Sequence, residues 1–541
     1  MTWLSFRRHH PYAPAPEDTR IVNLRSVASP GELLSVAVSV MAETSAVEIE
    51  ITAAALGGSA GTIPVAAIEV FVAKVWEQAG VGVYQSERTA VAELLVKDDR
   101  EVLRDGYISH CEHWWHRLRS RNYYSPPHLR MSGPVRTALA PASAKLVWVS
   151  VRLPADCAVG LYTGHLEVQA ADPALPALRL QLEIEVLPLT LVAPQQDLLL
   201  FYKGTLNCRL PRHHVSEATF TAQLQDIHDH GFTSLSLTED RPRLLQRALD
   251  VAHAIGFRRN ILLVSPFPRD LSRIDFHGMT PIYYISDEPD VHGAAFMAAL
   301  VRDWHVAKRS GALSMASLLN HAFASRFDAD DDIGHAPDIL LLYLATNLHF
   351  FSGYAHFAEL RARAMYYYWL THMEKPLLHR VLAGLYLWKS KARGIAPYCY
   401  QHLPVHPYSP LDDFDEWEPG YHVGGERRPF KDHMTTYRAQ QGSIPTLQWK
   451  ALSDGLTDLK YLATAEAALG AAEQLEGKAA GSLAADVRHR IETFVDRISL
   501  MRVNIVSDTD PAPYIDVDAQ DLARFRCQLA ADIVELQALR R

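Results

Sequence analysis

The sequence lacks any apolar run that approaches the roughly 20 residues needed to cross a bilayer. Near the N-terminus, Arg7-Arg8-His9-His10 are not followed by an apolar segment, so the pattern predicts no secretory signal. We therefore expect a cytoplasmic protein that does not contact a membrane.

Cysteine is scarce. The chain has five cysteines, an odd number, and they are far apart with no CxxC pair. This spacing predicts neither a disulfide framework nor a zinc site, and it favours a reducing compartment. The net charge of -9 argues against a general nucleic-acid binder, which would present a basic face. Without a Gly-rich loop or an Arg cluster, phosphate chemistry is not expected, and we predict no cofactor and no metal.

The length of 541 residues is too great for one hydrophobic core, so two to four domains are expected. Residues 1–190 are predicted to form an antiparallel β-sandwich, because short alternating runs are separated by Gly, Pro, Asp and Ser. These runs cover residues 33–40, 46–52, 144–154, 160–170 and 178–187, with an irregular insertion at 105–134.

Residues 191–440 alternate between strand-like and helix-length amphipathic runs, which predicts a central (β/α)8 barrel of the TIM type. The strand-like runs are nearly continuous in apolar residues, as expected of strands buried on both faces. We place them at residues 198–202, 233–237, 260–264, 282–285, 313–319, 339–344, 365–369 and 395–400, and the clearest helices at 220–230, 243–255, 294–308 and 376–389.

The last part of the chain, residues 441–541, is predicted to be helical and to pack on the barrel. Helices are expected at residues 447–475, 482–501 and 521–539. The proline- and aromatic-rich stretch 403–441 follows the eighth strand, so we expect it to lie over the same face of the barrel.

Two adjacent carboxylates, Asp287 and Glu288, follow the apolar run 282–285. The carboxyl ends of barrel strands carry the chemistry of this fold. Neighbouring side chains on a strand point to opposite sides, so both can face one pocket only if the strand ends at Asp287. Pro289 favours such an end. In the alternative interpretation, Asp287 caps the next helix and Glu288 is a solvated loop residue.

The other predicted strand ends carry aromatic rings, amides and imidazoles, which suit a sugar. Aromatic rings stack on the apolar faces of sugars, while amides and imidazoles bond the hydroxyls. The predicted substrate contacts are Tyr202, Lys203, Glu239, Asn320, Asn347, Tyr368, Trp369, Trp388, Tyr398, Tyr400, Gln401 and His402. Trp388 could equally pack inside its helix. His321 and His349 could join the carboxylates around a metal, but this is the less favoured interpretation.

Glycoside hydrolysis usually needs an acid for the leaving oxygen and a second carboxylate opposite. The seventh strand ends in Tyr-Trp-Leu-Thr, and the nearest carboxylate there, Glu374, lies downstream. This favours a route in which the substrate's own 2-acetamido oxygen attacks the anomeric carbon. Asp287 would orient the acetamido group and Glu288 would be the general acid and base. Glu288 would need a raised pKa, through the charge beside it and through burial among Tyr283, Tyr284 and Trp369.

Two alternatives stay open at this point. One is a glycosidase for a sugar without an acetamido group, with Glu239 or Glu374 as nucleophile. The other is a non-catalytic carbohydrate-binding protein, since a fold alone does not fix a function.

Three stretches resemble glycoside hydrolase family 123 and the related domain of unknown function 4091. They are residues 148–164 (WVSVRLPADCAVGLYTG), Ser286-Asp287-Glu288-Pro289, and residues 442–462 (GSIPTLQWKALSDGLTDLKYL). The third stretch keeps four residues of the family pattern: Gly455, Asp458, Tyr461 and Leu462. The charged residues of that pattern are replaced by Gln448, Lys450 and Ser453. That stretch could also simply be a buried helix face.

The resemblance implies a sandwich-plus-barrel architecture. It also implies a retaining, substrate-assisted β-N-acetylgalactosaminidase, a hydrolase of β-linked 2-acetamido sugars. Carried over by position, Asp287 matches the residue that stabilises the acetamido group, and Glu288 matches the general acid/base. The expected partner is an oligosaccharide or glycoside substrate.

Overall fold

The computed structural model describes most of the chain. The described residues are 4–59, 61–79, 88–102, 129–210, 213–268, 270–319, 337–344, 364–370, 375–401, 435–439, 442–475, 478–498 and 516–539, with the short strands 414–415, 422–423, 426–427 and 430–431. Asn320, His321, Asn347, His349, Glu374 and His402 lie outside them. None of the helices in this part of the chain is long and apolar enough to cross a membrane.

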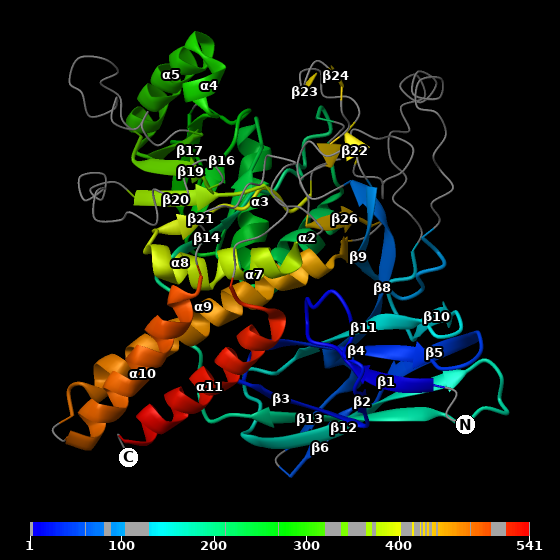
Figure 1. The fold of residues 1–541 in the computed structure, drawn as a ribbon. Coiled ribbons are helices and arrows are strands. Elements are labelled where there is room, and N and C mark those ends of the chain that lie inside the picture. Colours follow the sequence, from blue (N-terminus) through cyan, green and yellow to red (C-terminus); the bar gives the residue numbers. More distant parts are fainter. Residues whose placement is uncertain are drawn as a thin grey trace, which may run out of the picture.

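The N-terminal part folds into two sheets that share one hydrophobic core, so the predicted sandwich is present (Figure 1). Pairing is antiparallel except between β13 and β3. The first sheet has the order β2-β1-β4-β11-β8-β9, with β1 (Leu4–Arg8), β2 (Arg20–Ile21), β4 (Leu33–Ala42), β8 (Ile68–Ala79), β9 (Arg88–Val96) and β11 (Ala144–Arg152). The second contains β3 (Asn23–Ala28), β5 (Val47–Ala53), β6 (Leu56–Gly58), β7 (Gly61–Ile63), β10 (Val135–Leu139), β12 (Gly160–Ala170) and β13 (Leu178–Val186).

The central part contains a closed barrel of eight parallel strands, and all eight predicted strands are confirmed. They are β14 (Asp197–Leu200), β15 (Ser234–Leu237), β16 (Asn260–Leu263), β17 (Thr280–Ser286), β18 (Leu313–Leu318), β19 (Ile339–Tyr343), β20 (Ala364–Tyr368) and β21 (Gly394–Ile395). Side chains alternate between the interior and the surrounding helices: Leu199 belongs to the interior cluster, whereas Leu198 and Leu200 belong to the outer one.

Within the described residues, the helices around the barrel do not complete the strict (β/α)8 pattern. The four clearest predictions are confirmed by α2 (Glu217–Asp229), α3 (Pro242–Ile255), α5 (Ala294–Ser310) and the pair α7 (Pro376–Ala383) and α8 (Leu385–Ser390). The third connection has no helix within residues 264–268 and 270–279, where Pro266 and Pro268 disfavour one. The fifth and sixth connections fall largely outside the described residues.

Three C-terminal helices are present as predicted: α9 (Leu447–Ala472), α10 (Lys478–Asp496) and α11 (Ala519–Ala538). The first, α9, is buried around most of its circumference because it packs against α7 of the barrel and against β4 and β9 of the sandwich (Figure 1). The interpretation of residues 442–462 as a buried helix face is therefore confirmed for the helical part. Gln448, Lys450 and Ser453 are buried in this helix.

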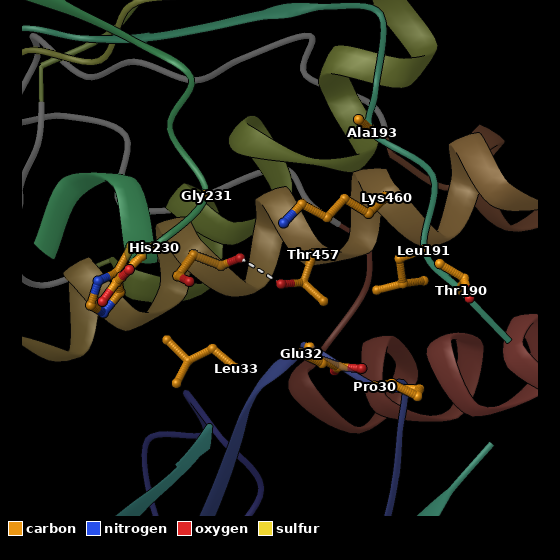
Figure 2. Close-up of a pocket in the computed structure, with 13 residues that line it drawn as sticks. Pro30, Glu32, Leu33, Thr190, Leu191, Ala193, His230, Gly231, Thr457 and Lys460 are labelled. Atoms are coloured by element: carbon orange, nitrogen blue, oxygen red, sulfur yellow. Dashed lines mark hydrogen bonds between the residues drawn. The ribbon is translucent and has the colours of Figure 1, made fainter. Parts of the chain in front are cut away.

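A crevice of about 240 Å³ lies where the sandwich, the linker after β13, the end of α2 and α9 meet (Figure 2). Glu32 enters it from the sandwich, and Thr457 and Lys460 from α9. Burial lowers the pKa of Lys460, while the charge of Glu32 opposes that shift. The crevice therefore brings an acidic and a basic side chain together.

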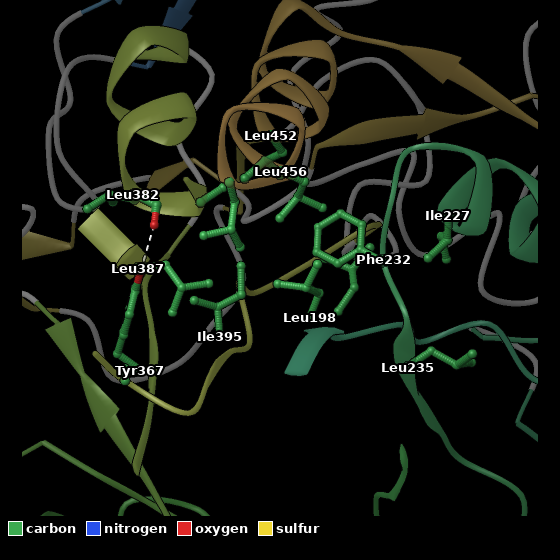
Figure 3. Close-up of a cluster of buried hydrophobic side chains, with 14 of the residues drawn as sticks. Leu198, Ile227, Phe232, Leu235, Tyr367, Leu382, Leu387, Ile395, Leu452 and Leu456 are labelled. Carbon is green, nitrogen blue, oxygen red and sulfur yellow. Dashed lines mark hydrogen bonds between the residues drawn. The ribbon is translucent and has the colours of Figure 1, made fainter. Parts of the chain in front are cut away.

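The contact between α9 and α7 is unusually close. A Cβ added to Gly455 would lie 2.3 Å from the carbonyl oxygen of Arg380, and one added to Gly384 would lie 2.3 Å from the carbonyl oxygen of Gly455. No real Cβ fits at that distance, so the two backbones can touch only through glycine. Around this contact, Leu452 and Leu456 join leucines of α7 and α8 and the outer face of the barrel strands (Figure 3).

Candidate active site

The sequence Asp287-Glu288 lies directly after β17, at the carboxyl end of the barrel. The strand ends at Ser286, and its pairing with β18 shifts register between Tyr284 and Ser286. Glu288 then takes a left-handed backbone conformation, with φ 46° and ψ 52°. Strand alternation therefore stops before the two carboxylates. The requirement derived from the sequence, that the strand be ending at Asp287, is met.

Two hydroxyl groups hold one oxygen of Asp287. The Tyr284 hydroxyl donates to Oδ1 at 2.6 Å, and the Ser317 hydroxyl donates to the same atom at 2.9 Å. Ser317 in turn accepts the backbone N–H of Glu288 at 2.9 Å. Oδ2 of Asp287 accepts no hydrogen bond from any described residue, and the side chain is exposed. The carboxylate is thus fixed at one oxygen and available at the other.

Glu288 is more enclosed, and its pKa is raised. Burial is the largest cause, the hydrogen bond from Tyr368 opposes it, and the neighbouring charge of Asp287 adds to the rise. The Tyr368 hydroxyl donates to Oε1. On the other side, Nε2 of His292 lies 3.5 Å from Oε2. The pKa of Glu288 is therefore raised, as the proposed role requires. The residues around Glu288 differ from those expected.

The sequence predicted that Tyr283 and Trp369 would enclose Glu288, and this was wrong. Both side chains face the helices. Tyr283 packs against Phe267, and Nε1 of Trp369 donates to Nδ1 of His379 at 2.7 Å. Alternation along β17 and β20 explains this, because their neighbours Tyr284 and Tyr368 take the inward positions.

Aromatic rings form the layer beside the carboxylates. Phe201 lies 5.8 Å from the ring of Tyr284 and 5.4 Å from the ring of Tyr398, centroid to centroid. Nζ of Lys203 lies 4.9 Å from the centre of the Tyr398 ring. From β19 and β20, Tyr343 packs against Tyr368 with ring centroids 5.1 Å apart. All of these residues lie at or just beyond the carboxyl ends of strands.

Of the predicted substrate contacts in the described residues, Lys203, Tyr368 and Tyr398 are brought to this end of the barrel interior. Others point outward and are engaged elsewhere. The Tyr202 hydroxyl donates to Gln223, and the Tyr400 hydroxyl donates to Asp226, both in α2.

Three further predicted contacts form hydrogen bonds with groups other than the carboxylate pair: Gln401, Trp388 and Glu239. Gln401 is buried between Gln223 and Thr436. Trp388 donates to Glu466 of α9 from the last turn of α8, which leads back to the start of β21. Glu239 is 1% exposed and accepts the backbone N–H of Leu206 at 2.7 Å.

Sequence reasoning missed Ser317 and His292. The available signal for Ser317 was that β18 contains serines, Ser314 and Ser317, among apolar residues, since a buried hydroxyl needs partners. His292 lies four residues after Glu288, one turn along the helical segment.

Two crevices among the described residues lie away from the carboxylate pair. One is the domain junction of Figure 2, and the other, of about 520 Å³, opens at the amino end of the barrel strands around Asp197, Arg259 and Arg393. In the second, Asp197 is already paired, with Arg259 at 3.2 Å and Arg393 at 3.4 Å. We place the candidate site at the carboxylates because their geometry and electrostatics suit chemistry.

The comparisons with known proteins concern this fold, a sandwich followed by an eight-stranded barrel. No family model and no curated protein matches the chain. A family 123 glycoside hydrolase from Clostridium perfringens is similar over 96% of both chains, with a TM-score of 0.63 and 12% identity.

Two further structures match with TM-scores of 0.28, which is too low to inform the fold or the function. A β-glucuronidase from Bacteroides uniformis is 8% identical over 73% of this chain and 45% of that one. A family 5 xyloglucanase from Bacteroides ovatus is 8% identical over 81% and 98%. Of these three structures, the C. perfringens enzyme has a TM-score above 0.5, and at 12% identity the likeness concerns the fold.

Proposed function

We propose that the protein is a retaining glycoside hydrolase that cleaves a β-linked 2-acetamido sugar, of the N-acetylgalactosaminide kind, with the help of the substrate's own acetamido group. The observation that carries this proposal is that two adjacent carboxylates have different surroundings. Asp287 is anchored at one oxygen and available at the other. Glu288 has a raised pKa. The similar C. perfringens enzyme is described as acting in glycolipid glycan hydrolysis, and a glycan substrate for this chain agrees with that.

In the first step, Glu288 gives its proton to the glycosidic oxygen as the bond to the anomeric carbon breaks. The acetamido oxygen attacks that carbon, which forms an oxazolinium ion, while Oδ2 of Asp287 accepts the acetamido N–H. In the second step, Glu288 takes a proton from water, which opens the ring with net retention. The anchoring of Oδ1 by Tyr284 and Ser317 keeps the carboxylate oriented without reorganisation.

The test uses aryl glycosides of the 2-acetamido sugar and of the plain hexose. We expect Glu288→Gln to lower kcat for poor leaving groups by about 10²- to 10⁴-fold, and Asp287→Asn to cause a similar loss. A thiazoline derived from the acetamido sugar, which mimics the bicyclic ion, should inhibit the wild type strongly.

The matched control is Glu239→Gln, which removes the alternative nucleophile that the structure describes. Because Glu239 is buried and bonded to the backbone, we expect this variant to retain activity. Full activity in both carboxylate variants, or loss of activity only in Glu239→Gln, would overturn the proposal. Saturable sugar binding without hydrolysis would favour a non-catalytic role.

A further inference from the structure

A pair of exposed rings in contact with each other lies beside Glu288. The imidazole of His292 packs on the ring of Phe296 with centroids 4.7 Å apart and planes inclined by 32°. His292 is at the end of α4 (Pro289–His292), and Phe296 is in the first turn of α5. The side chain of His292 is 46% exposed and Phe296 is 38% exposed, so each offers a surface to solvent. Figure 1 shows α4 and α5 together above β17.

The backbone around this pair is anchored to the site. The N–H of His292 donates to the carbonyl of Glu288 at 3.1 Å, and the hydroxyl of Ser286 donates to the carbonyl of Phe296 at 3.1 Å. The backbone that carries the two rings therefore keeps a fixed position relative to the acid. Truncating either side chain leaves these backbone contacts in place.

The hydrogen bonds of Glu288 distinguish its two oxygens. Oε1 accepts the hydroxyl of Tyr368, while Oε2 is the oxygen that faces His292. An oxygen that accepts a donated hydrogen bond favours the proton on the other oxygen of the carboxyl group. The proton that Glu288 transfers is therefore carried by Oε2, and the glycosidic oxygen must approach from the side of His292.

We propose that His292 and Phe296 form the binding subsite for the leaving group, which is the sugar or aryl group on the reducing side of the cleaved bond. The exposed Phe296 ring suits the apolar face of a sugar or an aryl ring. The imidazole of His292 can bond a hydroxyl of the leaving group. This inference depends on the proposed function, because it uses Glu288 as the acid.

The test compares substrates that share the 2-acetamido glycone and differ in the leaving group: a disaccharide, an aryl glycoside and the glycosyl fluoride. Fluoride has no surface to stack on a ring. We expect Phe296→Ala and His292→Gln to lower kcat/KM for the disaccharide and the aryl glycoside by about tenfold, while kcat/KM for the fluoride changes less than about twofold.

Val291→Ala is the matched control, since it truncates an exposed apolar side chain in the same short helix, and it should leave all three values unchanged. Equal losses on all substrates, or no loss on any, would overturn the inference alone when the wild type is active. A wild type that hydrolyses none of the three would overturn the proposed function, and the inference with it.

Discussion

The junction between the domains is held by a buried ion cluster centred on Asp458 of α9. Arg380 of α7 donates to its carboxylate at 2.7 and 3.1 Å, and Arg526 of α11 donates at 2.6 Å. Arg526 also lies 3.8 Å from Glu32 of the sandwich. One carboxylate therefore bridges two guanidinium groups that come from different parts of the fold. We predict that Asp458→Asn destabilises the protein strongly.

The magnitude follows from burial. The side chains of Arg380 and Asp458 are both 5% exposed, so water cannot replace the lost charge. Removing one partner of a buried pair typically costs about 3–5 kcal/mol, because the other charge is left uncompensated. The Asn variant keeps the shape of the side chain, so the loss reports charge and not packing. Tyr461, whose hydroxyl donates to Glu32, should remain in place.

The assay is urea unfolding followed by circular dichroism at neutral pH. The control is Glu217→Gln, which breaks an ion pair with Arg247 whose members are both about half exposed, and it should cost less than about 1 kcal/mol. The pKa of Asp458 is lowered, and its attraction to the two arginines outweighs burial, the largest single cause. The stabilisation is therefore present above the unfolded pKa near 3.9 and is lost as the pH falls below it. Equal unfolding midpoints for the two variants would refute this account.

Two further predictions address the helix contact and the acid. Gly455→Ala should destabilise the protein by about 1–3 kcal/mol, because the new Cβ meets the Arg380 carbonyl, whereas Gly470→Ala in the same helix, with open space around it, should stabilise it by up to about 1 kcal/mol. Urea midpoints of both variants check the sign. The alkaline limb of the pH profile of kcat/KM should lie above pH 4.5, the ordinary pKa of a glutamic acid, because Glu288 must be protonated and its pKa is raised. In Asp287→Asn the alkaline limb of the remaining kcat/KM should move to lower pH, since the neighbouring negative charge is gone. A shift to higher pH would contradict the assignment of Glu288 as the acid.

The fold was predictable where burial is visible in the sequence. The barrel strands are apolar on both faces, so their existence could be predicted, and all eight are present. For the same reason their orientation could not be predicted. A run such as residues 366–369, with three tyrosines and a tryptophan, contains no alternation that tells which ring faces inward. Tyr368 and Trp369 were both expected at the site, yet of the two Tyr368 occupies the inward position.

The two acids of the site could be predicted from the sequence, but the contacts that hold them could not. The adjacent acids and the proline are visible in the sequence. The hydroxyl of Ser317 comes from the next strand, 30 residues away from Asp287, and only closure of the barrel brings them together. The domain boundaries near residues 190 and 440 stay predictions. The motif residue Asp458 belongs to the junction, so a resemblance that contains it reports architecture and not catalysis.

The left-handed backbone of Glu288 leads to a last prediction. A residue with a Cβ at φ 46° carries strain of about 1–2 kcal/mol, which glycine does not. Glu288→Ala and Glu288→Gly both remove the carboxylate, so both should be inactive, but the glycine variant should be as stable as the alanine variant or up to about 1 kcal/mol more stable. At an ordinary helical position the order is the reverse, and Ala467→Gly, exposed in α9, should cost about 1 kcal/mol. Urea midpoints of the four proteins, including the wild type, decide the sign. If Glu288→Gly is less stable than Glu288→Ala by the usual amount, the backbone at Glu288 is not left-handed in the folded protein. The two acids would then return to opposite sides of the strand, and the site as described could not form.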